Sequence, residues 1–284
     1  MTKRVLTGAA FAVLVLVGVL LQGWAMFALI ALAMVVSVFE MYRAIRATGI
    51  EPVRWAGYFF CAISILAQGA AFYLTENLHL SMYALLISVM AAMIRLVMRG
   101  KVAVDSLMAT VFPMLYPGIF YLALMDLLRL KNSAVITVAL VLAFFCASIN
   151  DVFALFSGML FGKYKLSPIL SPKKTVEGSI GGLVASVLFA MAVPSLVRLI
   201  FCWNPEFVEG LSVLPPLWAF AILGFVGGAL SQIGDLAASM VKRHCGVKDF
   251  GHILPGHGGI MDRMDGILFC GVACTFFFKI TGLG

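Results

Sequence analysis

Nine apolar stretches, each about as long as a membrane-crossing helix, constrain this sequence more than any other feature. A transmembrane α-helix needs about 20 consecutive, mostly apolar residues. Only 12% of the residues are charged and 63% are apolar, which leaves too little polar surface for a soluble protein. We therefore expect an all-α integral membrane protein, a polytopic helical bundle with about nine transmembrane helices. The predicted spans cover residues 5–22, 24–42, 55–74, 80–98, 106–128, 134–151, 179–201, 215–241 and 265–283.

Basic residues are distributed unevenly between the two sides that nine spans define. Sixteen of the 20 Lys and Arg residues fall in the N-terminus and in segments 43–54, 95–104, 162–177 and 242–264. Cytoplasmic loops carry such an excess, so we predict that the N-terminus and these segments face the cytoplasm and that the C-terminus lies outside. These loops also explain the net charge of +7, which in a soluble chain would suggest a nucleic-acid partner. We expect none.

The chain contains no long linker and no low-complexity tract, so we expect one membrane domain over residues 1–284. Residues 1–130 read mainly as membrane scaffold, and the polar residues that could carry chemistry concentrate in residues 145–265. The six cysteines form no C-x-x-C pair, which favours reduced, packed thiols over a disulfide framework or a zinc site.

The eighth span carries a polar stripe. Ser231, Asp235, Ser239 and Lys242 recur at helical spacing and share one helix face. A carboxylate inside a membrane helix is costly unless it is paired, hydrated or bound to a metal. Asp235 is therefore a candidate functional residue, and an internal Asp–Lys pair that joins two helices is the structural alternative.

A glycine-rich segment follows this span. Its glycines flank His257, and Gly258 and Gly259 would let backbone amides approach a phosphate closely. Asp262 and Asp265 are three residues apart, so they share a face if a helix begins here. Together with Asp235 they would form an oxygen-rich site suited to Mg²⁺.

A second polar cluster lies at 162–178, on the same predicted side. Lys173 and Lys174 could hold phosphate groups as point charges, or they could simply contact anionic lipid headgroups. Thr175 is a candidate helix cap, and Gly178 and Gly182 form a small-xxx-small pair typical of close helix packing.

Two of these segments resemble a known family. Residues 239–265 contain Ser-x-apolar-Lys-Arg, then Lys-Asp, then His-Gly-Gly, then Asp-Arg-x-Asp, and this run resembles the C-terminal hallmark of phosphatidate cytidylyltransferases. The segment Ser-Pro-Lys-Lys-Thr-Val-Glu-Gly at 171–178 is similar to the family's second conserved segment. The likeness departs at Asn150-Asp151-Val152-Phe153-Ala154, where many bacterial members carry Asp-(Ser/Thr)-Gly-Ala-Tyr. No role follows for Asn150 and Asp151.

The resemblance implies transfer of CMP from CTP to phosphatidic acid, which gives CDP-diacylglycerol and pyrophosphate. It implies an active site on the cytoplasmic face of the membrane (the inner membrane in a bacterium), contact with membrane lipids, and a homodimer. It also implies Mg²⁺, with Mn²⁺ not distinguished, held by Asp235, Asp262 and Asp265.

Roles for individual residues follow from their chemistry, with the family's conserved segments as a guide to position. The predicted catalytic residues are Lys242, Arg243, Lys248, His257, Asp262 and Asp265. The predicted substrate-binding residues are Ser171, Lys173, Lys174, Ser239, Gly258, Gly259 and Arg263.

Two other functions fit parts of the pattern. A CTP-dependent polyprenol or phytol kinase would share the nucleotide site and differ in the acceptor. An ion-coupled transporter would use Asp235 as its coupling acid, although the sequence shows no internal repeat of the kind common in transporters. Glu40, Asp105 and Asp126 lie near span ends, where we expect solvated side chains.

Overall fold

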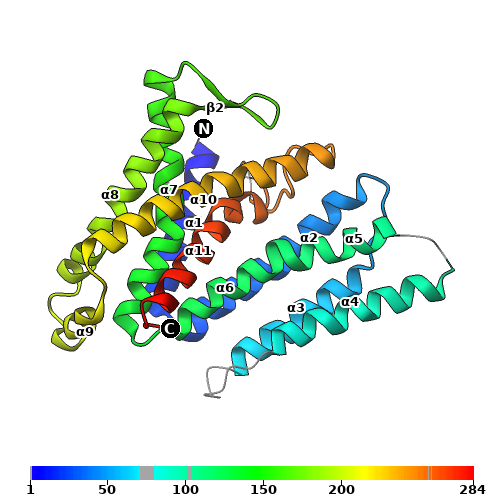
Figure 1. Ribbon diagram of the computed structural model, residues 1–284, viewed down its shortest axis with the longest axis horizontal. Helices are drawn as coiled ribbons and strands as arrows, with labels where there is room; N and C mark the ends of the chain where they lie inside the picture. Colours follow the sequence, from blue (N-terminus) through cyan, green and yellow to red (C-terminus); the bar gives the residue numbers. More distant parts are fainter. Residues whose placement is uncertain (1, 71–79, 101–103, 255, 257) are drawn as a thin grey trace. The chain divides into compact units, whose positions relative to one another are not determined.

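The computed structural model describes residues 2–70, 80–100, 104–254, 256 and 258–284, with side chains from residue 12 onward. Helices dominate this part of the chain (Figure 1). Two compact units can be distinguished, and each combines segments that are distant in the sequence. Unit 1 comprises Met1–Phe11, Phe27–Met125 and Val241–Arg263, and unit 2 comprises Ala12–Met26, Asp126–Met240 and Met264–Gly284.

Apart from residues 71–74 of the third span, which lie outside the described residues, each predicted span overlaps a helix or a run of helices. These are α1 (Thr2–Leu21), α2 (Gly23–Arg46), α3 (Arg54–Ala70), α4 (Leu80–Met98), the run α5 (Val104–Pro113), η1 (Met114–Ile119), α6 (Phe120–Asp126) and η2 (Leu127–Arg129), then α7 (Ser133–Phe161), α8 (Val176–Ile200), α10 (Leu217–His244) and α11 (Met261–Ile280). The short elements α9 (Pro205–Gly210) and η3 (Leu211–Val213) lie between α8 and α10.

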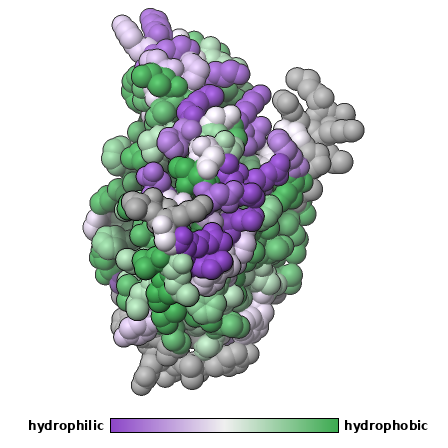
Figure 2. Space-filling view, turned by 90° about the vertical axis from the view of Figure 1, so that its right-hand side faces the viewer, coloured by the Kyte–Doolittle hydropathy of each residue, from purple (hydrophilic) through white to green (hydrophobic). Residues whose placement is uncertain are grey.

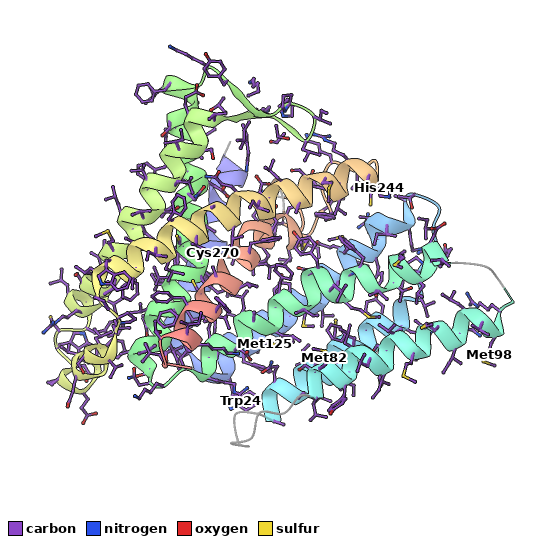
Figure 3. The ribbon with its side chains drawn as sticks, viewed as in Figure 1. Trp24, Met82, Met98, Met125, His244 and Cys270 are labelled. Atoms are coloured by element: carbon purple, nitrogen blue, oxygen red, sulfur yellow. The ribbon has the colours of Figure 1, made fainter. Side chains whose placement is uncertain are left out.

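Six of these segments in the described part of the chain are long and apolar enough to cross a membrane. They are Gly23–Arg46, Leu80–Met98, Val104–Arg129, Ser133–Phe161, Val176–Ile200 and Leu217–His244. Figure 2 shows hydrophobic side chains over much of the visible surface, as expected of a protein solvated by lipid. On α4, Met82 and Met98 are both exposed (Figure 3). The chain is therefore a polytopic, helical membrane protein.

In unit 1, α3 and α4 lie side by side, and hydrogen bonds tie α2 to the helices around it. The Tyr42 hydroxyl donates to the backbone oxygen of Thr110 (2.7 Å), and Ser37 and Tyr121 are joined through their hydroxyls (2.7 Å). The fifth predicted span is not one regular helix, because Tyr116 leaves helical geometry (φ −130°, ψ 112°) just before Pro117. A residue that precedes proline is disfavoured in the α conformation, which explains the break.

In unit 2, α7 and α8 pack along much of their length, and α10 and α11 belong to the same unit for most of their residues. Local capping sets the helix ends: the Asn132 side chain accepts the Val135 N–H at the start of α7 (2.9 Å), and Thr175 accepts the Gly178 N–H at the start of α8 (3.1 Å). The predicted cap at Thr175 is thus confirmed.

Candidate active site

The loop between α7 and α8 folds into a small hairpin, which the sequence analysis did not predict. Strand β1 (Lys165–Ser167) pairs antiparallel with β2 (Ser171–Thr175), with Lys165 opposite Thr175 and Ser167 opposite Ser171. The Val176 N–H extends the pairing to the Tyr164 oxygen (2.9 Å). The hairpin places the two predicted phosphate-binding lysines on a strand that leads directly into α8.

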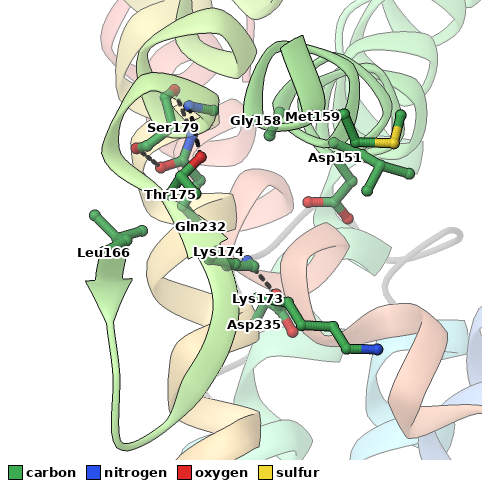
Figure 4. A pocket seen from close by; sticks show the side chains of 13 residues that line it. Asp151, Gly158, Met159, Leu166, Lys173, Lys174, Thr175, Ser179, Gln232 and Asp235 are labelled. Atoms are coloured by element: carbon green, nitrogen blue, oxygen red, sulfur yellow. Dashed lines mark hydrogen bonds and ion pairs between the residues drawn. The ribbon is translucent and has the colours of Figure 1, made fainter. Parts of the chain in front are cut away.

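A pocket of about 330 Å³ opens beside this hairpin, entirely within unit 2. Its polar side carries Asp151 from α7, Lys173 and Lys174 from β2, and Asp235 from α10 (Figure 4). Its apolar lining residues include Leu155 and Met159 of α7, which are 62% and 63% exposed, and Leu166 of β1. The pocket is therefore amphipathic: it combines cationic and anionic groups with apolar side chains, two of which are exposed on α7. We call it the hairpin pocket.

Within the hairpin pocket the Lys174 ammonium forms an ion pair with the Asp235 carboxylate (Figure 4). Their side chains are 26% and 27% exposed, so the pair is partly shielded from water. Asp235 therefore does pair with a lysine, but Lys174 lies on strand β2, so the pair joins α10 to the hairpin and does not join two helices. Neighbouring Lys173 is exposed and pairs with no carboxylate in the described part of the chain.

A buried network of amide and hydroxyl groups supports one wall of this pocket. The Asn150 amide nitrogen donates to the Ser186 hydroxyl (2.9 Å) and to the Gly228 oxygen (3.2 Å), and its amide oxygen accepts from Gln232 (3.0 Å). Gln232 also bonds Ser179, and both residues line the pocket. Asn150 thus joins α7, α8 and α10 and fixes the helices that present Asp151 and Asp235. No role for Asn150 follows from the sequence.

A second cluster of predicted residues lies in unit 1, around Asp262. Oxygen Oδ1 of this carboxylate accepts from the Lys242 ammonium (2.8 Å), and Oδ2 accepts the backbone N–H groups of Phe250 (2.8 Å) and Gly259 (3.0 Å). The Lys242 nitrogen also lies 5.3 Å from the centre of the Phe250 ring. Lys242 and Asp262 are therefore mutual partners in this structure, and Asp262 ties Phe250 and Gly259 to the end of α10.

The two predicted phosphate-binding glycines fit closely against carboxylates. A Cβ at Gly258 would meet Oδ2 of Asp262 at 2.8 Å, and a Cβ at Gly259 would collide with the carboxylate of Glu40. Gly258 also has a positive φ of 82°, which most side chains disfavour. The Gly259 amide donates to Asp262 in this structure.

The remaining predicted residues are divided between the two units. Arg243, Lys248 and Arg263 are exposed in unit 1, whereas Ser239 is half-buried and Asp265 is buried in unit 2. Ser171 pairs with Ser167 in the hairpin. His257 lies outside the described residues.

The three predicted metal ligands are divided between the two units, because Asp262 lies in unit 1 and Asp235 and Asp265 lie in unit 2. In the described part of the chain no three His, Cys, Asp or Glu side chains gather closely enough to share an ion. Asp235 is paired with Lys174, and both oxygens of Asp262 already accept hydrogen bonds. Mg²⁺ and its three carboxylate ligands therefore stay a prediction from the resemblance.

One acidic residue was read incorrectly from the sequence. Glu40 was expected to be solvated, but it is 1% exposed and accepts backbone hydrogen bonds at the start of α11. Its position near the end of an apolar span gave no signal of this, because its partners lie 220 and 221 residues further along the chain.

Comparison with known proteins identifies the family. The family model described as "Cytidylyltransferase family" matches residues 2–281. The chain is similar to phosphatidate cytidylyltransferase 5, chloroplastic, of Arabidopsis thaliana, with 32% identity over 99% of this chain and 72% of the relative. It is 42% identical to the phosphatidate cytidylyltransferase of Staphylococcus saprophyticus over 127 residues, which span 45% of this chain and 44% of that relative. This polytopic membrane protein belongs to the cytidylyltransferase family.

Proposed function

We propose that the chain is a phosphatidate cytidylyltransferase: it transfers CMP from CTP to phosphatidic acid and releases pyrophosphate. Membership of the cytidylyltransferase family over nearly the whole chain supports the nucleotidyl transfer. The hairpin pocket supports the acceptor, and it is the single observation that carries the proposal. A lipid phosphate needs cationic groups for its headgroup and an apolar surface for its acyl chains, and the pocket offers both side by side.

The reaction requires two polyanions to approach each other. An oxygen of the phosphatidate phosphate attacks the α-phosphorus of CTP and forms a new P–O bond. The bond from the α-phosphorus to the bridging oxygen of the β-phosphate breaks, and its electron pair leaves with pyrophosphate. The attacking oxygen is already anionic, so no strong general base is needed. The main barrier is charge repulsion, which positively charged side chains lower.

Lys173 and Lys174 are the residues of the hairpin pocket best suited to this task. Lys173 is exposed and carries a charge available to a phosphate oxygen. Lys174 is held by Asp235, which keeps its ammonium inside the pocket rather than extended into solvent. When a phosphate binds, Lys174 exchanges part of its contact with Asp235 for the phosphate oxygens. Asp235 then becomes available to another cation.

Mg²⁺ and a homodimer remain predictions from the family resemblance, and no step of this scheme depends on either. We place the hairpin at the cytoplasmic end of α7 and α8, in agreement with the basic residues that it carries. CTP would then reach the pocket from the cytoplasm, and phosphatidate would enter from the inner leaflet, where its headgroup lies at the same depth.

The first experiment measures pyrophosphate release and CDP-diacylglycerol formation by the purified protein in detergent. CTP, phosphatidic acid and Mg²⁺ are supplied together and then omitted one at a time. We expect turnover only when CTP and phosphatidic acid are both present, and its dependence on Mg²⁺ tests the predicted metal. Turnover with a polyprenol in place of phosphatidate would support the kinase alternative. Cation-driven uptake into proteoliposomes without CTP consumption would support the transporter.

A further inference from the structure

Glu40 is a buried carboxylate that lies at the first turn of α11. Its oxygen Oε1 accepts the N–H of Ile260 (3.2 Å) and Oε2 accepts the N–H of Met261 (2.9 Å). Met261 is the first residue of α11, a helix of 20 residues. The first N–H groups of a helix have no partners within it, and a negative charge is favourable at that end. Glu40, contributed by α2, therefore caps α11 from a distant part of the sequence.

Two glycines that precede α11, Gly251 and Gly259, lie directly against the same carboxylate. A Cβ at Gly251 would collide with Glu40 Oε1, and a Cβ at Gly259 would collide with both oxygens. Both positions lack a side chain, and this lets the backbone of residues 251 and 259 pass directly against the carboxylate. Gly251, Gly259 and Glu40 thus form one packed cluster at the start of α11.

This packed cluster lies next to predicted catalytic residues, which also belong to unit 1. Asp262 follows Met261 directly, and its Oδ2 accepts the N–H of Gly259, whose Cα packs on Glu40. Its other oxygen holds Lys242 at 2.8 Å. A shift of the first turn of α11 would move the Asp262 carboxylate, and Lys242 would follow it. In the described part of the chain, Glu40 forms no hydrogen bond or ion pair with Asp262 or Lys242.

We propose that Glu40 is a positioning residue: it fixes the first turn of α11 and thereby the orientation of Asp262 and Lys242 that CMP transfer requires. The expected effect of Glu40 on kcat rests on the proposed function. Its structural consequence, the restraint of the α11 start by Glu40, can be measured independently of any activity.

The test uses the full-length Glu40→Gln protein in detergent. The amide can accept only one of the two N–H groups, because its nitrogen is itself a donor. The control is Glu51→Gln, which removes an exposed carboxylate of the same unit that pairs with Arg46. We expect hydrogen exchange of the amides at 260–263 to accelerate about tenfold in Glu40→Gln, with exchange in α3 unchanged. The kcat for CDP-diacylglycerol formation should fall about tenfold, while the KM for CTP changes less than about twofold.

Gly251→Ala provides a second variant in case Glu40→Gln folds poorly. It retains the charge of Glu40 but forces the carboxylate away from its position, so we expect the same local exchange and the same loss of kcat. Unchanged exchange at 260–263 in both variants would overturn the proposal, and so would faster exchange with unaltered kcat. If the wild-type protein forms no CDP-diacylglycerol, the proposed function fails, while the exchange measurement still decides whether Glu40 restrains α11.

Discussion

At the scale of single residues, the Lys174–Asp235 pair is the contact most directly connected to the proposed chemistry. Both side chains are about a quarter exposed and line the hairpin pocket. Ion pairs that keep contact with water contribute little to stability, and we propose that this pair serves to keep both charges in the pocket. Replacement of either residue should therefore affect substrate turnover more than folding.

We predict that Lys174→Gln lowers CDP-diacylglycerol formation by about 100-fold, the loss typical of one important electrostatic contact. The matched control is Lys165→Gln, which removes the same charge from the other strand of the hairpin, outside the pocket. Steady-state kinetics of both variants give the comparison, and their melting temperatures should match the wild type. Equal losses in the two variants would mean that the total charge of the hairpin matters and the position of Lys174 does not.

A second residue-scale prediction concerns Asp265, which is 8% exposed on α11. We expect Asp265→Asn to retain expression and folding, because the amide keeps the shape of the side chain and one acceptor oxygen. Activity should fall by about 100-fold or more, because the negative charge is lost. The measurement is turnover of CTP by the purified variant beside the wild type. A near wild-type rate would remove Asp265 from the catalytic residues.

At the scale of elements, close contact between α7 and α8 depends on glycine. A Cβ at Gly178 would lie 2.6 Å from the backbone oxygen of Ala154, and one at Gly182 would lie 2.8 Å from that of Asn150. Backbone atoms cannot give way as a flexible side chain can, so the helices would have to separate. The small-xxx-small interpretation of this pair is therefore confirmed.

We predict that Gly182→Ala destabilises the protein by about 1–3 kcal/mol, the usual range for overpacking a close interior contact. The affected backbone belongs to Asn150, so the amide network beside the hairpin pocket should also be disturbed. Ile180→Ala is the control, since Ile180 lies on the same helix and is 57% exposed. Thermal unfolding in detergent measures both. If Gly182→Ala melts at the wild-type temperature, the two helices can separate at no cost.

The helices were predictable from the sequence, whereas the hairpin was not. Long apolar runs identify helices, because in a membrane only helices and closed barrels satisfy the backbone. Strands of three and five residues, rich in Lys and Ser, carry no such pattern. Thr175 was predictable as a cap because capping involves residues only three apart. The break at Tyr116 could have been inferred from Pro113 and Pro117.

At the scale of the whole molecule, the sequence identified many candidate site residues but not their partners. Lys174 and Asp235 were both singled out, yet nothing in their local patterns indicated that they pair although they are 61 positions apart. The same holds for Glu40, whose burial is decided by contacts with residues 260 and 261. Local chemistry is visible in a sequence, but long-range contacts are set by the packing of the chain.

The cysteines provide a means to test how the molecule lies in the membrane. Five of the six are buried and Cys202 is exposed. Cys245 lies just beyond α10, where burial raises the pKa of its thiol above the ordinary value. Maleimides react with the thiolate, so at neutral pH Cys245 should react more slowly than a solvated thiol, and its labelling should increase only as the pH rises toward that higher pKa. Cys202 should therefore be the principal site of labelling in the folded protein.

Cys202 lies between α8 and α10, in a segment predicted to face outside because 16 of the 20 basic residues occur on the opposite side. We predict that a membrane-impermeant maleimide labels Cys202 in intact bacterial spheroplasts that express the protein, without permeabilisation. Cys202→Ser is the control and should remove the label. Labelling that appears only after the membrane is opened would reverse the orientation. The hairpin lies at the other end of α8. If α8 spans the membrane, a reversed orientation would place the hairpin pocket on the side away from cytoplasmic CTP. That outcome would conflict with the proposed function. Orientation and function are thus linked through one native residue, and this experiment tests both.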